Sequence, residues 1–116
     1  MLARDFYLRF VGLVNALNKD ELELAIDPVA LRLLDIVATA HAKGEPMTVR
    51  QAMKLKEVAS PATVHRKLRA LNDAGLLTAE FQGRDRRTKY LTPTAKAIER
   101  FDAIGEAMLK LTASGS

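Results

Sequence analysis

The chain of 116 residues has room for one domain with a modest core, and its 48% hydrophobic content is typical of a folded protein rather than a disordered one. It has no cysteine, which excludes disulfides and thiolate metal sites and favours a reducing compartment. The net charge of +4 is uneven, because thirteen Lys and Arg stand against six Asp and Glu between Lys43 and Arg100. Such concentration suits a surface that binds a polyanion, although charge alone is explained as well by a merely soluble surface.

Residues 2–17 predict a helix, because apolar side chains recur there at helical spacing: Phe6, Phe10, Leu13 and Leu17. Three more lie off this stripe: Leu8, Val11 and Val14. A helix that is apolar nearly all round needs burial on more than one side, so we expect a second chain to cover it. The polar stretch 18–23 should end the helix.

We expect the same segment to be neither a membrane span nor a secretory signal. No apolar run in the chain reaches the ~18 residues that a span requires. Residues 1–17 contain Arg4, Asp5 and Arg9 and lack a small-residue cleavage site. We therefore expect no membrane partner and a cytoplasmic location.

Three short motifs predict the starts of further helices. Asp27-Pro28 and Ser60-Pro61 each place a capping side chain before a proline at the first helical position. Thr48, with Gln51 three residues on, forms a capping box. Glycines supply left-handed stops after two of these helices, at Gly44 and Gly75.

The sequence changes period after Gly75. Residues 77–82 alternate apolar and polar, which predicts a strand, followed by a loop at 83–87 and a return strand at 88–91. Thr92-Pro93 should begin a last helix, and residues 113–116 read as a frayed tail. The apolar residues of that helix are spaced as in a short heptad seam: Ala97, Phe101, Ile104, Met108 and Leu111.

A short helix, a turn, a second helix and a hairpin with a basic tip form, in this order, a winged helix-turn-helix. Residues 47–96 resemble the DNA-binding core of MarR-type transcriptional regulators. The most specific matches are the stretches Ser60–Arg66, Leu71–Leu76, Asp85–Arg87 and Leu91–Pro93.

The resemblance implies a mostly α-helical fold with a small β-hairpin wing. We expect one domain, 1–116, with the DNA-binding core at 47–92 and terminal dimerisation helices at 1–18 and 93–112. In the family the second helix of the motif enters the major groove and a wing arginine, oriented by a neighbouring aspartate, reaches the adjacent minor groove. Helices from both ends form a homodimer, for which we expect these contacts: Phe6, Phe10, Leu13, Phe101, Ile104 and Met108.

The residues of the second helix suit a DNA contact physically. If Val64, Leu68 and Leu71 face inward, the outward face carries Ala62, Thr63, His65, Arg66 and Arg69. Ser60 and free N–H groups at the helix start can bind phosphate. Thr63, His65 and Arg66 can meet base edges, and Arg66 can be bidentate to guanine. The alternative is an ordinary amphipathic helix with a basic solvated face.

The hairpin tip is the reason to prefer the DNA contact over that alternative. It carries Arg84, Asp85, Arg86 and Arg87 in a row. A planar guanidinium on a narrow tip fits the negative potential of a minor groove. We expect Asp85 to hold Arg86 or Arg87 extended; the alternative is a screened surface pair worth ~0–1 kcal/mol.

Other classes of function have little basis in the sequence. His41 and His65 are the only histidines, and there is neither a glycine-rich phosphate loop nor a nucleophile elbow, so we expect no enzyme, metal or cofactor. The prediction is a homodimeric, nucleoid-associated transcriptional regulator that binds double-stranded DNA. A small-molecule effector is compatible with the resemblance but has no support in the residues. Two alternatives remain: a winged-helix module that docks an acidic protein, and a plasmid or phage replication or partition factor.

Overall fold

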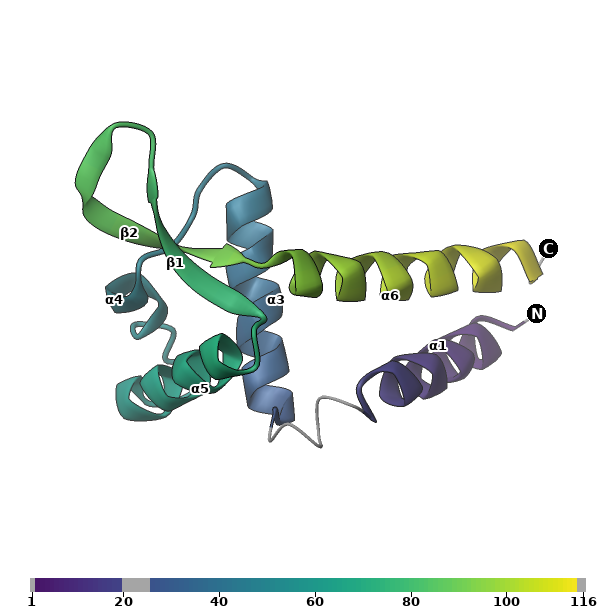
Figure 1. Cartoon of the computed structure of the whole chain (residues 1–116). Coiled ribbons are helices and arrows are strands. Elements are labelled where there is room, and N and C mark those ends of the chain that lie inside the picture. Colours follow the sequence, from purple (N-terminus) through teal and green to yellow (C-terminus); the bar gives the residue numbers. More distant parts are fainter. Residues whose placement is uncertain (1, 20–25, 115–116) are drawn as a thin grey trace.

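The computed structural model describes residues 2–19 and 26–114 (Figure 1). Its elements are α1 (Ala3–Leu17), α3 (Pro28–Ala42), α4 (Val49–Ala52), α5 (Pro61–Asp73), β1 (Leu77–Gln82), β2 (Asp85–Pro93) and α6 (Ala95–Ser114). The predicted fold class, mostly helical with a two-stranded antiparallel hairpin, is confirmed. The polar interruption predicted at 18–23 falls largely outside the described residues.

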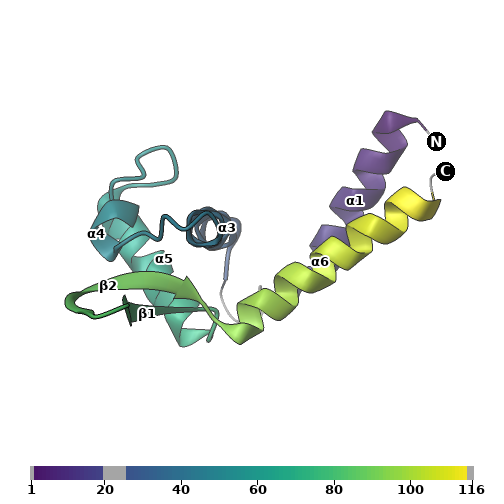
Figure 2. The same cartoon turned by 90° about the horizontal axis from the view of Figure 1, so that it is seen from above.

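The molecule has two parts, which we call the body and the terminal arm. The body consists of α3, α4, α5 and the hairpin, whereas α6 leaves it as a long arm with α1 alongside (Figures 1 and 2). The molecule is therefore elongated, with extents of 51 × 29 × 24 Å. Within the described ranges, no helix combines the length and apolar character that crossing a bilayer requires.

Side-chain caps confirm the three predicted helix starts in the body. Asp27 Oδ1 accepts a hydrogen bond from a first-turn N–H of α3 at 2.9 Å, and Ser60 Oγ accepts one from α5 at 3.3 Å. Thr48 and Gln51 form the reciprocal bonds of the capping box at the start of α4. Each cap satisfies an N–H that its helix leaves unpaired. Positive φ angles at Gly44 and Gly75 confirm the predicted stops.

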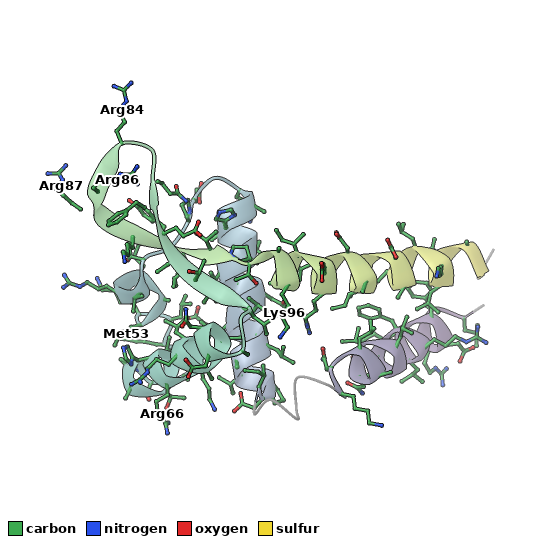
Figure 3. All side chains as sticks on the ribbon, in the orientation of Figure 1. Met53, Arg66, Arg84, Arg86, Arg87 and Lys96 are labelled. Carbon is green, nitrogen blue, oxygen red and sulfur yellow. The ribbon has the colours of Figure 1, made fainter. Side chains whose placement is uncertain are left out.

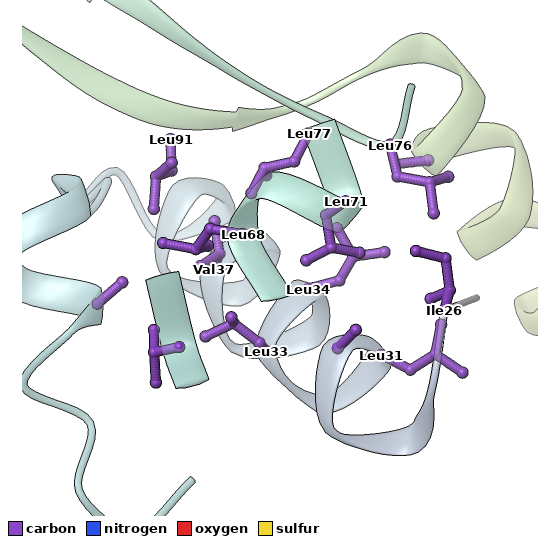
Figure 4. Close-up of a cluster of buried hydrophobic side chains, with 14 residues drawn as sticks. Ile26, Leu31, Leu33, Leu34, Val37, Leu68, Leu71, Leu76, Leu77 and Leu91 are labelled. Carbon is purple, nitrogen blue, oxygen red and sulfur yellow. The ribbon is translucent and has the colours of Figure 1, made fainter. Parts of the chain in front are cut away.

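The hydrophobic core lies between α3, α5 and the base of the hairpin (Figure 4). The stripe predicted for α5 is buried: Val64, Leu68 and Leu71. Helix α3 faces it with Leu33, Leu34 and Val37, and the hairpin side closes the cluster with Leu76, Leu77 and Leu91. Full burial of such a side chain contributes roughly 1.5–3 kcal/mol, so this cluster is the main source of stability in the body.

The hairpin differs from the prediction at its tip. The expected loop at 83–87 shrinks to Gly83 and Arg84, and β2 begins at Asp85 rather than at Thr88. The pairing explains this difference, because Phe81 lies opposite Lys89 whereas Gln82 lies opposite Asp85. Residues 86–88 are therefore extra residues on β2, an irregularity that local sequence does not reveal.

The last helix also begins later than predicted. Thr92 and Pro93 still belong to β2, and Thr94 caps α6 by accepting a hydrogen bond from the Ala97 N–H at 3.2 Å. Ala97, the first residue of the expected seam, is fully buried in the core of the body instead. The first turn of α6 thus belongs to the body, and only the later turns extend into the arm.

The terminal arm is apolar but uncovered. No residue of α1 is buried, and its capping position, Leu2, makes no side-chain cap. Large apolar side chains on both arm helices face solvent, among them Leu8 at 57% and Leu109 at 71% exposure. A groove of about 350 Å³ between the two helices is lined mainly by apolar side chains, including Leu13, Ala107 and Leu111.

Candidate nucleic-acid interface

The outward face of α5 carries the residues that the sequence assigned to it. Ser60, Ala62, His65, Arg66 and Arg69 are exposed, while Thr63 is half-buried. The reason is the buried stripe on the opposite face, which fixes the rotation of the helix against α3. Figure 3 shows Arg66 projecting away from the body.

Three of these side chains form a hydrogen-bonded chain. Thr63 Oγ1 accepts one bond from Ser60 Oγ and another from Arg66 Nη2, both at 3.0 Å. The guanidinium of Arg66 is therefore held along the first turn of α5. Arg66 is exposed, and a guanidinium has five N–H donors, so donors remain for a bidentate contact.

The phosphate site expected at the start of α5 has fewer backbone donors than the sequence suggested. Pro61 has no N–H, the Thr63 N–H donates to Ser60 Oγ, and the Val64 N–H donates to the Ser60 carbonyl. In the described structure this leaves Ala62 as the first-turn residue whose N–H has no partner. A phosphate here would rely on that single N–H, joined by the Ser60 hydroxyl only when its one proton turns from Thr63 Oγ1 to the phosphate.

Helix α5 is anchored to α3 by an ion pair. Lys67 Nζ donates to Asp27 Oδ2, and Asp27 also caps α3. The hydrogen bond from Lys67 holds the pKa of Asp27 below its ordinary value. The two side chains are 25% and 40% exposed, so solvent screening limits the pair to roughly 0–1 kcal/mol of stability. Its main consequence is geometric, because it fixes α5 relative to α3.

The far end of α5 is anchored to the junction between β2 and α6. Lys96 Nζ donates to the Ala74 carbonyl at 2.8 Å, and Thr94 Oγ1 donates to the Gly75 carbonyl at 2.6 Å (Figure 3 labels Lys96). Asn72 Nδ2 donates to the Leu77 carbonyl at 3.1 Å. The bonds from Lys96 and Thr94 satisfy carbonyls at the end of α5, and the bond from Asn72 ties α5 to the first residue of β1. The exposed face of α5 therefore sits on a support fixed at both ends.

The Asp85 carboxylate selects one of the two arginines that the sequence allowed. Its Oδ1 accepts from the Arg87 backbone N–H at 2.8 Å and lies 3.5 Å from Arg87 Nε. The Arg87 side chain is nonetheless 93% exposed, so it is restrained but fully presented to solvent. Figure 3 shows Arg84 and Arg87 projecting outward from the hairpin.

Arg86 has a different partner, which sequence reasoning missed. Its Cζ lies 5.6 Å from the centroid of the Phe81 ring, and Lys89 Nζ lies 5.3 Å from the same centroid. Both distances are within the ~6 Å range of a cation–π interaction. A strand pattern that alternates apolar and polar residues identified Phe81 as an apolar position, but it could not show that the ring lies beyond the core among cations.

A pocket of about 360 Å³ separates α5 from the hairpin. His65 and Arg69 line it from α5, and Thr78 and Ala79 line it from β1. These two side chains of α5 therefore lie on the side of the helix that faces the hairpin. Among the described residues, no group of three His, Cys, Asp or Glu is placed to hold a metal ion.

The body is a winged helix-turn-helix, with α4 and α5 as the two helices of the motif and the β1–β2 hairpin as the wing. Its fold is that of MarR-like transcriptional regulators. One such regulator, from Thermotoga maritima, aligns with a TM-score of 0.64 over 98% of this chain and 80% of that chain, at 21% identity.

Two further solved structures share this fold. A substituted form of MepR from S. aureus bound to an oligodeoxyribonucleotide has a TM-score of 0.62 over 98% of this chain and 82% of its own, at 17% identity. NadR in complex with 4-hydroxyphenylacetate has a TM-score of 0.57 over 96% and 70%, at 17% identity. No family model and no curated protein sequence matches the chain.

Proposed function

We propose that this chain is a sequence-specific transcriptional regulator that binds double-stranded DNA as a homodimer. The observation that carries the proposal is the gathering of exposed arginines on α5 and on the wing, while the helix and hairpin behind them are fixed by a neutral core. Its fold neighbours are named as transcriptional regulators, and one is bound to an oligodeoxyribonucleotide. A non-enzymatic role and a cytoplasmic, nucleoid-associated location belong to the same proposal.

On α5, we assign base reading to Thr63, His65 and Arg66 in the major groove. Arg66 is the strongest candidate, because its guanidinium is ordered by Thr63 and can be bidentate to guanine. Ser60, Ala62 and Arg69 would contact phosphates and fix the position of the helix on the duplex.

On the wing, we assign Arg84, Arg86 and Arg87 to the minor groove and its phosphates. Asp85 restrains Arg87 before binding, which lowers the entropy lost when the guanidinium enters a groove. Arg84 and Arg87 are exposed at the tip and have no packing role that would otherwise explain them, whereas Arg86 lies against the ring of Phe81.

The homodimer is proposed from the terminal arm. Phe6, Phe10 and Leu13 of α1 and Ile104 of α6 are only half-buried, and Met108 is 41% exposed. Phe101, also in the expected interface, packs in part against the core of the body. A symmetric dimer through the arm would cover these side chains and present two α5 helices to successive major grooves of a pseudo-palindromic site.

The test of base reading is Arg66→Ala. Binding to a duplex selected from random sequences should weaken by ~1–3 kcal/mol, while binding to random duplexes changes little, as fluorescence anisotropy would measure. Thr63 and His65 variants should alter preference at neighbouring positions. Equal losses on both kinds of duplex would show that Arg66 contacts only phosphate.

The test of the wing is a salt titration of Arg87→Ala and Asp85→Ala. Loss of the Arg87 contact should lower the slope of log affinity against log salt by ~0.9 per wing. Asp85→Ala should weaken binding despite removing a negative charge, because Arg87 loses its restraint. Unchanged affinity and slope in both variants would mean that the wing stays off DNA, and would favour the module that docks an acidic protein.

A further inference from the structure

Phe81 is an aromatic side chain that lies outside the buried hydrophobic cluster. It is 38% exposed and lies on the wing near the tip. Leu77, on the same face of β1, belongs to the core, but the buried cluster of the body does not reach Phe81. Two cations, Arg86 and Lys89, lie within cation–π range of the ring.

The strand register explains how both cations reach one ring. Phe81 and Lys89 are partners across the hairpin, so their side chains share a face. Arg86 lies in the three extra residues of β2, where an irregular strand can redirect a side chain. The irregularity thus brings the guanidinium of Arg86 to the ring that Lys89 already approaches from the opposite strand.

The ring and the Asp85 carboxylate order cations at different electrostatic cost. Asp85 restrains Arg87 but cancels part of the charge that would attract DNA. The ring of Phe81 attracts cations through its quadrupole and has no net charge, so Arg86 and Lys89 keep their full positive charge. Two like charges held near one ring also repel each other, and an anion between or beside them relieves that repulsion.

We infer that Phe81 is a positioning residue of the wing, whose ring gathers Arg86 and Lys89 into a paired cation site for a DNA backbone phosphate. This inference rests on the proposed function. It divides the wing into two units: Arg87 ordered by Asp85, and Arg86 with Lys89 ordered by an aromatic ring.

The alternative role for Phe81 is purely structural, as an apolar residue that stabilises the hairpin. Phenylalanines with one, two and three ring fluorines at position 81 distinguish the two roles, since they keep the shape and apolar character of the ring but progressively weaken its quadrupole. We expect duplex affinity to fall step by step along the series at constant melting temperature. A flat affinity across the series would overturn the inference.

Conventional variants give a second measurement. Phe81→Leu should lower affinity about 2- to 5-fold per wing, and Phe81→Tyr should retain it. In an Arg86→Ala, Lys89→Ala background, Phe81→Leu should have no further effect. Additive losses in that background would overturn the inference.

The outcomes separate this inference from the proposed function. If Arg86→Ala and Arg87→Ala weaken duplex binding but the fluorine series does not, only the role of Phe81 fails. If the unmodified protein binds no duplex, the proposed function fails and this inference fails with it. In the free protein, upfield ring-current shifts of the Arg86 and Lys89 side-chain resonances that disappear in Phe81→Leu would support the contact, and their absence in the unmodified protein would overturn it.

Discussion

The body and the terminal arm of this molecule differ in how their helices are capped and in how far their apolar side chains are buried. Each of the helices α3, α4 and α5 starts with a side-chain cap, and together they enclose a cluster of fully buried side chains. Helix α1 starts without such a cap and buries no residue, although apolar side chains occupy most of it. The body buries its apolar cluster within one chain, whereas the arm is as apolar as a protein interior but remains exposed.

This difference shows how the proposed function is divided along the chain. The body needs rigidity, because base reading requires a recognition helix held in one position. The arm needs a partner, because exposed apolar surface of this extent is typical of an interface. The anchors of Thr94 and Lys96 on the end of α5 connect the two parts, so the direction of the arm and the position of α5 are set together.

The largest expected effect comes from charging the arm. Leu8→Glu with Leu109→Glu should convert a dimer to a monomer at micromolar concentration, because a symmetric interface would bury each unpaired charge twice, at roughly 3–5 kcal/mol apiece. Light scattering would measure the mass. Val49→Glu, at an exposed apolar position of the body, is the matched control and should keep the mass of the unmodified protein. A stable monomer before any substitution would remove the basis for the dimer.

The next largest effect on stability is expected from truncating one leucine to alanine in each part. Leu71→Ala should lower the free energy of unfolding by about 2–5 kcal/mol, because the side chain is fully buried and leaves a cavity. Leu109→Ala, at 71% exposure, should cost far less in the isolated chain, and any cost should depend on protein concentration. Urea denaturation at two concentrations measures both. Equal, concentration-independent losses would contradict the division into body and arm.

Local signals in the sequence were enough to predict much of the body. Asp27-Pro28, Thr48 with Gln51, and Ser60-Pro61 place the caps, and the stripe of α5 gives its buried face, because capping and helical periodicity depend on neighbours in sequence. Predictions failed where pairing between residues far apart in the chain decides the start of an element. The start of β2 depends on the register around Phe81 and Lys89. The start of α6 depends on Thr94, whose hydroxyl donates to the carbonyl of Gly75 on the other side of the hairpin.

The candidate site follows the same rule. Which residues of α5 face outward could be predicted, since the buried stripe determines the rest of the helix. Which wing residues pair with each other could not be predicted. Asp85 is followed by two arginines that it could reach, and the ring of Phe81 meets Arg86 only because of the strand register.

Capping offers a smaller effect that sharpens the comparison. Ser60→Ala should destabilise the body by about 0.5–2 kcal/mol and should release Thr63, and with it Arg66. Leu2→Ser should add to α1 the cap that it lacks and raise the helix content of the arm, as circular dichroism would measure. If Ser60→Ala leaves the unfolding midpoint unchanged, the cap of α5 contributes nothing to the stability of the body.

The smallest expected effect concerns the ion pair that fixes α5 to α3. The hydrogen bond from Lys67 lowers the pKa of Asp27 in the folded chain, so the pair contributes stability above the ordinary pKa of an aspartate, and this contribution is lost as the pH falls through the lowered value.

Asp27→Asn separates the charge from the cap, because asparagine caps a helix about as well as aspartate. The variant should be less stable by about 0.2–1 kcal/mol at pH 7, and the difference should disappear as the pH falls through the lowered pKa of Asp27. Asp35→Asn is a control of opposite sign. Burial raises the pKa of the Asp35 carboxyl, so the contribution of this group to stability is present in acid, and it is lost as the pH rises through the raised pKa. Urea midpoints across pH 2.5–7 would measure both variants. A loss for Asp27→Asn that stays constant across this range would show that the carboxylate acts only as a cap and that the pair with Lys67 does not stabilise the body.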